Sequence, residues 1–167
     1  MGKRVPGKVG KMAFIRTIAQ ALRGLFVTPA RAATLATASA AIIYSGFAFS
    51  QRSLNTLAPT SPRIQAVAHC AIKRTKVDFV VYHGFRTEEE QRSMIARGVS
   101  WVNRSRHQDG EAIDVMALVG GKGTWEPEPY YEIAKAFYSC GNDLGIPITW
   151  GGEWKVKDLV HFEEKKP

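Results

Sequence analysis

The sequence is short of acidic residues at one end and short of cysteine throughout. No aspartate or glutamate occurs before Asp78, whereas residues 1–31 hold seven lysines and arginines. Cys70 and Cys140 are the only cysteines, too few and too far apart for a cysteine metal cage. In an exported domain they would pair as a disulfide, but two buried thiols fit the sequence equally well. The sequence alone therefore leaves the pairing open.

The net charge of +8 is concentrated at the N-terminus. Without the seven cations of residues 1–31, the chain has 16 basic and 15 acidic residues, so the remainder is close to neutral. We therefore expect no nucleic-acid-binding face on the main domain, and no nucleic-acid partner. The length of 167 residues and the hydrophobic fraction of 45% indicate one globular domain with an appendage, and we expect a monomer.

Residues 32–51 contain no charged side chain, and twenty residues are enough for a helix to cross a bilayer. The flanking cations predict a basic cytoplasmic segment at 1–31, an inner-membrane helix at 32–51 and a periplasmic domain beyond it. Thirteen of the twenty residues are Ala, Gly, Ser or Thr, so a signal-arrest-release helix that leaves the bilayer also fits. A cleaved signal peptide, or an Ala-rich helix buried in a soluble domain, would fit the same stretch.

The remainder predicts a linker at 52–62 and one domain at 63–167. Helices are expected from Ser61 to about Arg74, from Thr87 to Gly98 and over 130–145, and strands over 78–84, 111–118, 146–150 and 158–164. Ser61 with Pro62 forms a helix start, and Thr87 with Glu90 forms a capping box. Because no βαβ rhythm appears, the fold class is α+β.

Two short stretches carry metal-ligand residues. In "SRHQDGEAIDV" (105–115), a turn at Gly110 followed by a strand brings His107 over the strand face that carries Asp114. In "DLVHFEE" (158–164), alternation puts His161 and Glu163 on one face. His107, Asp114 and His161 together form a ligand set that leaves an open position for catalysis, as in catalytic zinc sites. Asp158 is placed to reach a water there as a general base.

Four stretches resemble the M15 family of zinc peptidases. "SRHQDGEAIDV" resembles its S-x-H-x-x-G-x-A-x-D signature, "DLVHFEE" its closing D-x-x-H-x-E element, and "HGFRT" (83–87) its G-x-R-T stretch. "DLGIPITWGGEW" (143–154) is similar to a segment of phage endolysins in that family. The resemblance covers roughly residues 53–164 in order, and it departs from the family at the end, where "HFEEKKP" replaces an apolar finish.

This resemblance implies a small mixed or antiparallel sheet with flanking helices, as in hedgehog-like domains, and a bacteriophage endolysin activity. The enzyme would cut peptidoglycan stem peptides as an L-alanyl-D-glutamate peptidase or a D-alanyl-D-alanine carboxypeptidase and so lyse the host. By the resemblance, one zinc ion is bound by His107, Asp114 and His161. Asp158 would be the general base and acid, Arg86 would stabilise the oxyanion or hold a substrate carboxylate, and Ser105 would support the site.

Three residues near the predicted site also fit purely structural roles. Arg86 could form a surface ion pair with Glu88–Glu90, Ser105 could cap a loop, and Glu163 fits a partner of His161 better than a ligand. The rival functions are a non-catalytic zinc-containing peptidoglycan-binding module, a host carboxypeptidase of wall metabolism, and a membrane-anchored structural protein. Asp158 argues against a purely structural zinc site, which has no need of a nearby carboxylate base.

Overall fold

The computed structural model describes residues 46–100 and 102–166. The predicted basic segment 1–31 and most of the predicted membrane helix 32–51 lie outside these residues. Within the described ranges, no helix combines the length and the apolar character needed to cross a bilayer. The described residues include every candidate ligand and catalytic residue that the sequence predicts.

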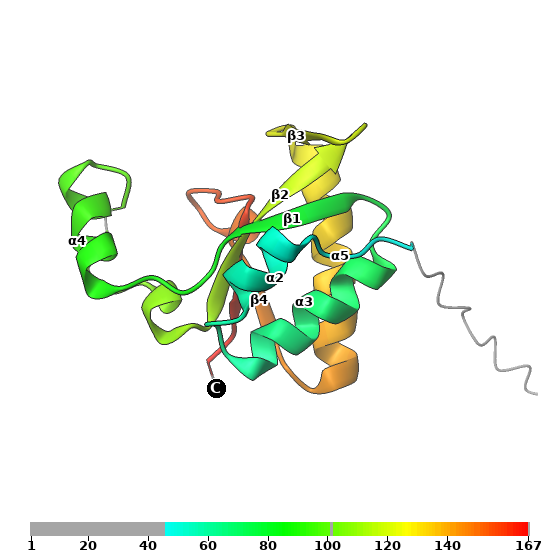
Figure 1. Cartoon of the computed structure of the whole chain (residues 1–167), viewed down its shortest axis with the longest axis horizontal. Helices are drawn as coiled ribbons and strands as arrows, with labels where there is room; N and C mark the ends of the chain where they lie inside the picture. Colours follow the sequence, from blue (N-terminus) through cyan, green and yellow to red (C-terminus); the bar gives the residue numbers. More distant parts are fainter. Residues whose placement is uncertain (1–45, 101, 167) are drawn as a thin grey trace, which may run out of the picture. The chain divides into compact units, whose positions relative to one another are not determined.

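A five-stranded antiparallel sheet forms the centre of the domain (Figure 1). Its strands are β1 (Asp78–His83), β2 (Ala112–Val119), β3 (Lys122–Thr124), β4 (Ile148–Trp150) and β5 (His161–Glu164). The order is β1-β2-β5-β4, and β3 pairs with β2 after a tight turn at Gly120 and Gly121. Both glycines adopt positive φ, which allows the turn. The predicted α+β class is thus confirmed, and of the mixed or antiparallel sheet that the resemblance implies, the structure has the antiparallel form.

Helices α3 (Pro62–Arg74) and α5 (Pro127–Leu144) pack against each other beside the sheet (Figure 1). Helix α3 begins as predicted, because the Ser61 hydroxyl accepts the Ile64 N–H and Pro62 occupies the first turn. The ring of Phe137 in α5 stacks on Phe162 of β5 with centroids 4.1 Å apart. The apolar core therefore lies between these helices and one face of the sheet.

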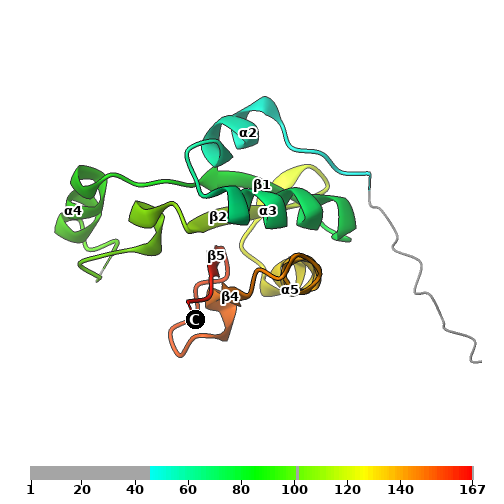
Figure 2. The ribbon, with the colours of Figure 1, turned by 90° about the horizontal axis from the view of Figure 1, so that it is seen from below.

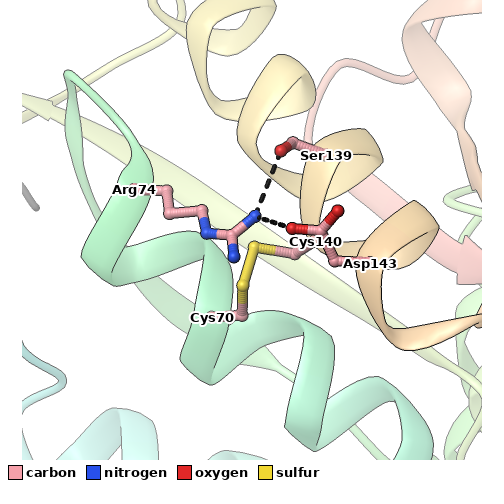
Figure 3. The surroundings of a disulfide bond; sticks show 5 residues. All are labelled: Cys70, Arg74, Ser139, Cys140 and Asp143. Carbon is pink, nitrogen blue, oxygen red and sulfur yellow. Dashed lines mark hydrogen bonds and ion pairs between the residues drawn. A yellow bond between two sulfur atoms is a disulfide. The ribbon is translucent and has the colours of Figure 1, made fainter. Parts of the chain in front are cut away.

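A disulfide joins the two helices. Cys70 of α3 and Cys140 of α5 are bonded, with their Cα atoms 5.8 Å apart (Figure 3). Beside the bond, Arg74 Nη1 donates to Asp143 Oδ2 at 2.5 Å and to Ser139 Oγ at 3.2 Å. The question that the sequence left open is settled in favour of pairing.

The sequence prediction of a linker at 52–62 is corrected by helix α2 (Gln51–Leu57). Ser50 caps this helix, and Ser53 and Leu57 are buried where it packs against β1. Figure 2 shows α2 and β5 on opposite sides of strands β1 and β2. A seven-residue helix is too short to display an amphipathic period, so its contacts with β1 rather than its sequence identify it.

Helix α4 (Glu88–Ala96) stands apart from the sheet and from the other helices (Figure 1). It begins with the predicted capping box between Thr87 and Glu90. Gln91 is its one buried residue. Gln91 accepts a hydrogen bond from Arg86 and donates to Ser100 and Val102, so hydrogen bonds attach the helix to the chain on either side of it.

Candidate metal centre

The sheet register brings the three predicted ligands together. Asp114 of β2 lies directly opposite His161 of β5. His107 lies in a short 3₁₀ helix, η2 (Arg106–Asp109), which ends at Gly110 in the left-handed region with φ of 69°. This turn directs His107 back over the face that carries Asp114, as the sequence predicts.

The three side chains meet at one point and are buried. His107 Nε2, Asp114 Oδ1 and His161 Nδ1 lie 3.2 Å from one another in each pair. Their exposed fractions are 2%, 8% and 6%, respectively. Two imidazole nitrogens and one carboxylate oxygen at this separation can hold a single divalent metal ion.

Hydrogen bonds on the far side of each ring select the nitrogen that faces the centre. His107 Nδ1 donates to the Gly84 carbonyl at 2.7 Å, because a carbonyl can only accept. Nε2 is therefore the His107 nitrogen that faces the centre, where it would bind a metal ion in its unprotonated form. His161 Nε2 donates to Glu163 Oε2 at 3.1 Å, which leaves Nδ1 toward Asp114. Glu163 is therefore an orienting partner of His161, as expected, and such partners raise the basicity of a metal ligand.

The charges of the cluster are strongly coupled. Burial alone would raise the pKa of Asp114, but its hydrogen bonds with His107, His161 and His83 hold that pKa well below the usual value. Burial alone would lower the pKa of His161, but its hydrogen bonds with Asp114 and Glu163 raise it to about 9. The carboxylate is thus ionised at neutral pH, as a metal ligand must be.

Arg86 lies buried beside the cluster rather than in a surface ion pair. Its exposed fraction is 6%, its Nη2 is 4.0 Å from Asp114 Oδ2, and its Nη1 donates to Gln91 Oε1 at 2.8 Å. Its Nε is buried and has no hydrogen-bond partner in the described part of the chain. A guanidinium fixed in this way is suited to an anionic group in the pocket.

Asp158 lies at the rim of the same pocket, three residues before His161. Its N–H donates to the Gly151 carbonyl at 2.9 Å. A Cβ on Gly151 would lie 2.5 Å from the Asp158 carbonyl oxygen, so this close approach requires glycine. Partial burial, and then the Asp114 carboxylate, raise the pKa of Asp158, which brings it closer to that of a base active near neutrality.

Ser105 acts on the backbone of the ligand loop. Its hydroxyl accepts the His107 N–H at 3.4 Å, and its own N–H donates to Gln108 Oε1 at 2.9 Å. This is the loop-capping role that the sequence also allows for Ser105. Since the cap fixes the η2 turn, Ser105 supports the site through His107, and it also lines the pocket.

Sequence reasoning missed His83 and did not assign Trp154. His83 Nδ1 lies 3.5 Å from Asp114 Oδ2, because an irregularity between Val81 and His83 shifts the register and pairs His83 with Asp114. Strict alternation would have put His83 on the core side with Val81. The Trp154 ring lies 5.1 Å from the His161 ring. Only its place in the "GGEW" turn just before "DLVHFEE" could have indicated it.

All of these groups open into one pocket of about 540 Å³. Its lining includes the three clustered side chains together with Arg86 and Asp158. A buried metal-ligand set, a carboxylate at the rim and a fixed guanidinium form an arrangement suited to metal-assisted hydrolysis.

Comparison with known proteins also indicates a hydrolytic enzyme. The profile of the family described as phage L-alanyl-D-glutamate peptidase matches residues 45–166. The L-alanyl-D-glutamate peptidase of Escherichia phage T5 is 33% identical over 124 residues, which cover 72% of this chain and 90% of that protein. The crystal structure of the Serratia marcescens L-Ala D-Glu endopeptidase ChiX superposes with a TM-score of 0.67 at 36% identity, covering 72% of this chain and 92% of the other.

Proposed function

The chain belongs to the phage L-alanyl-D-glutamate peptidase family and is a peptidase, and from this premise we propose that it cleaves the L-Ala–D-Glu bond of peptidoglycan stem peptides and so lyses the host cell. The observation that carries the proposal is the convergence of His107, Asp114 and His161 in a pocket that Asp158 and Arg86 also line. A non-catalytic wall-binding module would need neither of the last two groups.

The proposed cofactor is one zinc ion per chain, held by His107 Nε2, Asp114 Oδ1 and His161 Nδ1. The residues fit this ion because each imidazole has its other nitrogen bonded to an acceptor, which leaves a lone pair for the metal. Two imidazoles and one carboxylate are a donor set of the zinc type with an open position. When bound, zinc supplies a Lewis acid that polarises the scissile carbonyl and acidifies water.

The protein's own groups would then move the proton and stabilise charge. Asp158 accepts a proton from the attacking water and delivers it to the amine that leaves. The raised pKa of Asp158 makes its carboxylate a stronger base toward the attacking water. Arg86, positioned by Gln91, hydrogen-bonds to the developing oxyanion or to a carboxylate of the peptide.

Mass spectrometry of fragments from purified peptidoglycan tests the proposed bond. Digestion by the full-length protein should leave muramoyl-L-alanine and release peptides that begin with D-glutamate. Asp158→Ala should release neither product under the same conditions. Release of free D-alanine would instead show a carboxypeptidase, and binding to the wall without any cleavage would show the non-catalytic module.

We further propose that the protein reaches the wall by its N-terminus, with residues 1–31 cytoplasmic, an uncharged helix in the inner membrane and the domain periplasmic. The support is the cationic block before the uncharged stretch 32–51. The Phe49 ring lies 5.5 Å from Phe79, and Gln51 already begins α2, so the last residues of the stretch belong to the domain.

Fractionation of expressing bacteria before and after an uncoupler tests this proposal. A helix rich in Ala, Ser and Thr has a small free energy of insertion, so it should leave the bilayer when the uncoupler collapses the membrane potential. Full-length protein should then move from the membrane to the periplasm. A product shortened by about 48 residues, as for cleavage after a small-residue motif, would show a signal peptide instead. Retention in the membrane under both conditions would show a permanent anchor.

A further inference from the structure

We infer that helix α2 is a positioning element of the metal centre, although no predicted catalytic motif includes it. The helix fixes His83, which contacts the ligand Asp114, and Gly84, which orients the ligand His107. The inference rests on the proposed metal site and adds to it Ser53 and Gly84 as positioning residues. Two independent contacts of α2 with the end of β1 carry it.

The first contact runs through Ser53. Its exposed fraction is 1%, and its hydroxyl accepts the Val81 N–H at 3.2 Å. Strand β1 is at the edge of the sheet, so this N–H points away from β2 and would otherwise be buried without an acceptor. The register irregularity that comes immediately after it, between Val81 and His83, places His83 Nδ1 3.5 Å from Asp114 Oδ2. Ser53 therefore holds the backbone at the point where His83 is directed to the cluster.

The second contact is the close packing of α2 on Gly84. A Cβ on Gly84 would lie 2.3 Å from the Thr56 carbonyl oxygen and 3.0 Å from Thr60 Cγ2. Such an approach leaves no room for any other residue. The Gly84 carbonyl accepts the His107 Nδ1–H at 2.7 Å, and this bond selects the nitrogen that faces the metal. The end of α2 thus fixes the carbonyl that orients His107.

The turn after α2 contacts the same ligand loop from its other end. The Ser61 N–H donates to the Gly110 carbonyl at 2.8 Å. Gly110 ends the η2 helix that carries His107. Residues 53–61 therefore contact the chain both at Gly84, which orients the His107 ring, and at Gly110, which closes its backbone turn. A shift of α2 would loosen His107 on both sides.

This arrangement connects the N-terminal segment with the chemistry. Ser50 caps α2, and the preceding Phe49 packs on His69 and Phe79. Whatever displaces residues 46–50 from the domain will also release the cap of α2. The metal affinity of the enzyme should consequently depend on the docking of α2, although α2 contributes no ligand.

The test compares two variants that each remove one buried hydroxyl bonded to a strand N–H. Ser53→Ala removes the acceptor of Val81, whereas Tyr130→Phe removes a hydroxyl that accepts the Ala117 N–H at 3.4 Å in the part of β2 that pairs with β3, away from the ligands. Zinc affinity of the full-length protein in detergent is measured by competition with a chromophoric chelator, and thermal unfolding of the chelator-stripped protein is measured alongside. We expect the zinc Kd to rise about 10-fold in Ser53→Ala, which is the lower end of the change seen when a group that hydrogen-bonds to a ligand is removed. The zinc Kd should be unchanged in Tyr130→Phe.

A second pair of variants adds a methyl group instead of removing a hydroxyl. Gly84→Ala must move Thr56 or β1, whereas the Cβ of Gly123→Ala would meet the flexible Met116 side chain at 3.1 Å. Zinc affinity should fall in Gly84→Ala and persist in Gly123→Ala. Equal zinc affinities within both pairs, at whatever stability, would overturn the inference while leaving the metal site intact. Failure of the unmodified protein to bind zinc would instead remove the proposed function, and the inference with it.

Discussion

The two faces of the sheet are stabilised by different interactions. On the helix face, Phe137 stacks on Phe162, and a disulfide ties α3 to α5. On the opposite face, two histidines and an aspartate are almost fully buried against one another. Apolar burial is favourable by itself, whereas buried ionisable groups are costly unless they are paired or bind a metal.

Stability and chemistry therefore reside on separate faces of this domain. The helix face should maintain the fold whether or not a metal is present, and the site face should depend on the metal for a large part of its stability. Variants of one face should therefore change one property and leave the other.

Loss of a metal ligand should give the largest change. His161→Ala should abolish wall lysis and weaken zinc binding more than about 100-fold. Loss of a group that only hydrogen-bonds to a ligand typically costs less than that. A chelator should inhibit the unmodified protein in the same way. Zinc content by atomic absorption and turbidity of a peptidoglycan suspension are the measurements. Normal lysis by a zinc-free protein would contradict the assignment.

Removal of Asp158 should separate turnover from metal binding. Asp158→Ala should lower kcat by about 10²–10⁴-fold, the usual cost of losing a general base. Zinc content and the melting temperature should stay near those of the unmodified protein, because Asp158 is solvent-accessible at the pocket rim. Near-normal turnover in Asp158→Ala would mean that another group is the base, and Glu163→Gln would then be the variant to measure.

The two halves of the metal cluster could be predicted from sequence because each half depends on local geometry. A glycine turn followed by a strand places His107 and Asp114, and a second alternating strand presents His161. His83 could not be predicted, because its position depends on a register irregularity in β1. Helix α2 was missed because its identity comes from contact with an edge strand far along the chain rather than from a period of its own.

The disulfide shows the same limit from the other side. Both cysteines were expected in helices, but residue spacing alone does not say whether two helices lie side by side. The α+β class was predictable because no βαβ rhythm appears, and the resemblance to the zinc peptidases implied a mixed or antiparallel sheet. The positions that sequence patterns miss are those fixed by contacts between elements that are distant in the chain.

The disulfide should affect stability and leave the metal site unchanged. Replacing both Cys70 and Cys140 by serine should lower the free energy of unfolding by about 4 kcal/mol, from the loop entropy of a bond that spans 70 residues. Zinc Kd should not change, because the bond lies on the helix face. Chemical denaturation and chelator competition measure the two quantities.

The control for the disulfide is its immediate neighbour. Arg74→Ala removes the ion pair with Asp143 beside the bond and should cost about 1 kcal/mol, because the Asp143 partner is exposed to solvent. If loss of the disulfide weakened zinc binding as strongly as it weakened the fold, the two faces would be coupled, and their separation into a stability face and a site face would fail.

The metal affinity of the site face should also depend on pH. The pKa of His161 is raised to about 9 by Asp114 and Glu163, so a protein stripped of metal holds a proton there at neutral pH that zinc must displace. Zinc affinity should thus rise about tenfold per pH unit up to about pH 9 and then level off. In the stripped protein the sign for stability is opposite: the raised pKa contributes stability that is fully present below about pH 6.5 and is lost as the pH rises through about 9.

Calorimetry in buffers of different ionisation enthalpy should show about one proton released per zinc at pH 7. Asp158→Asn should keep this slope, and a pH-independent affinity would show that His161 is already neutral before the metal binds.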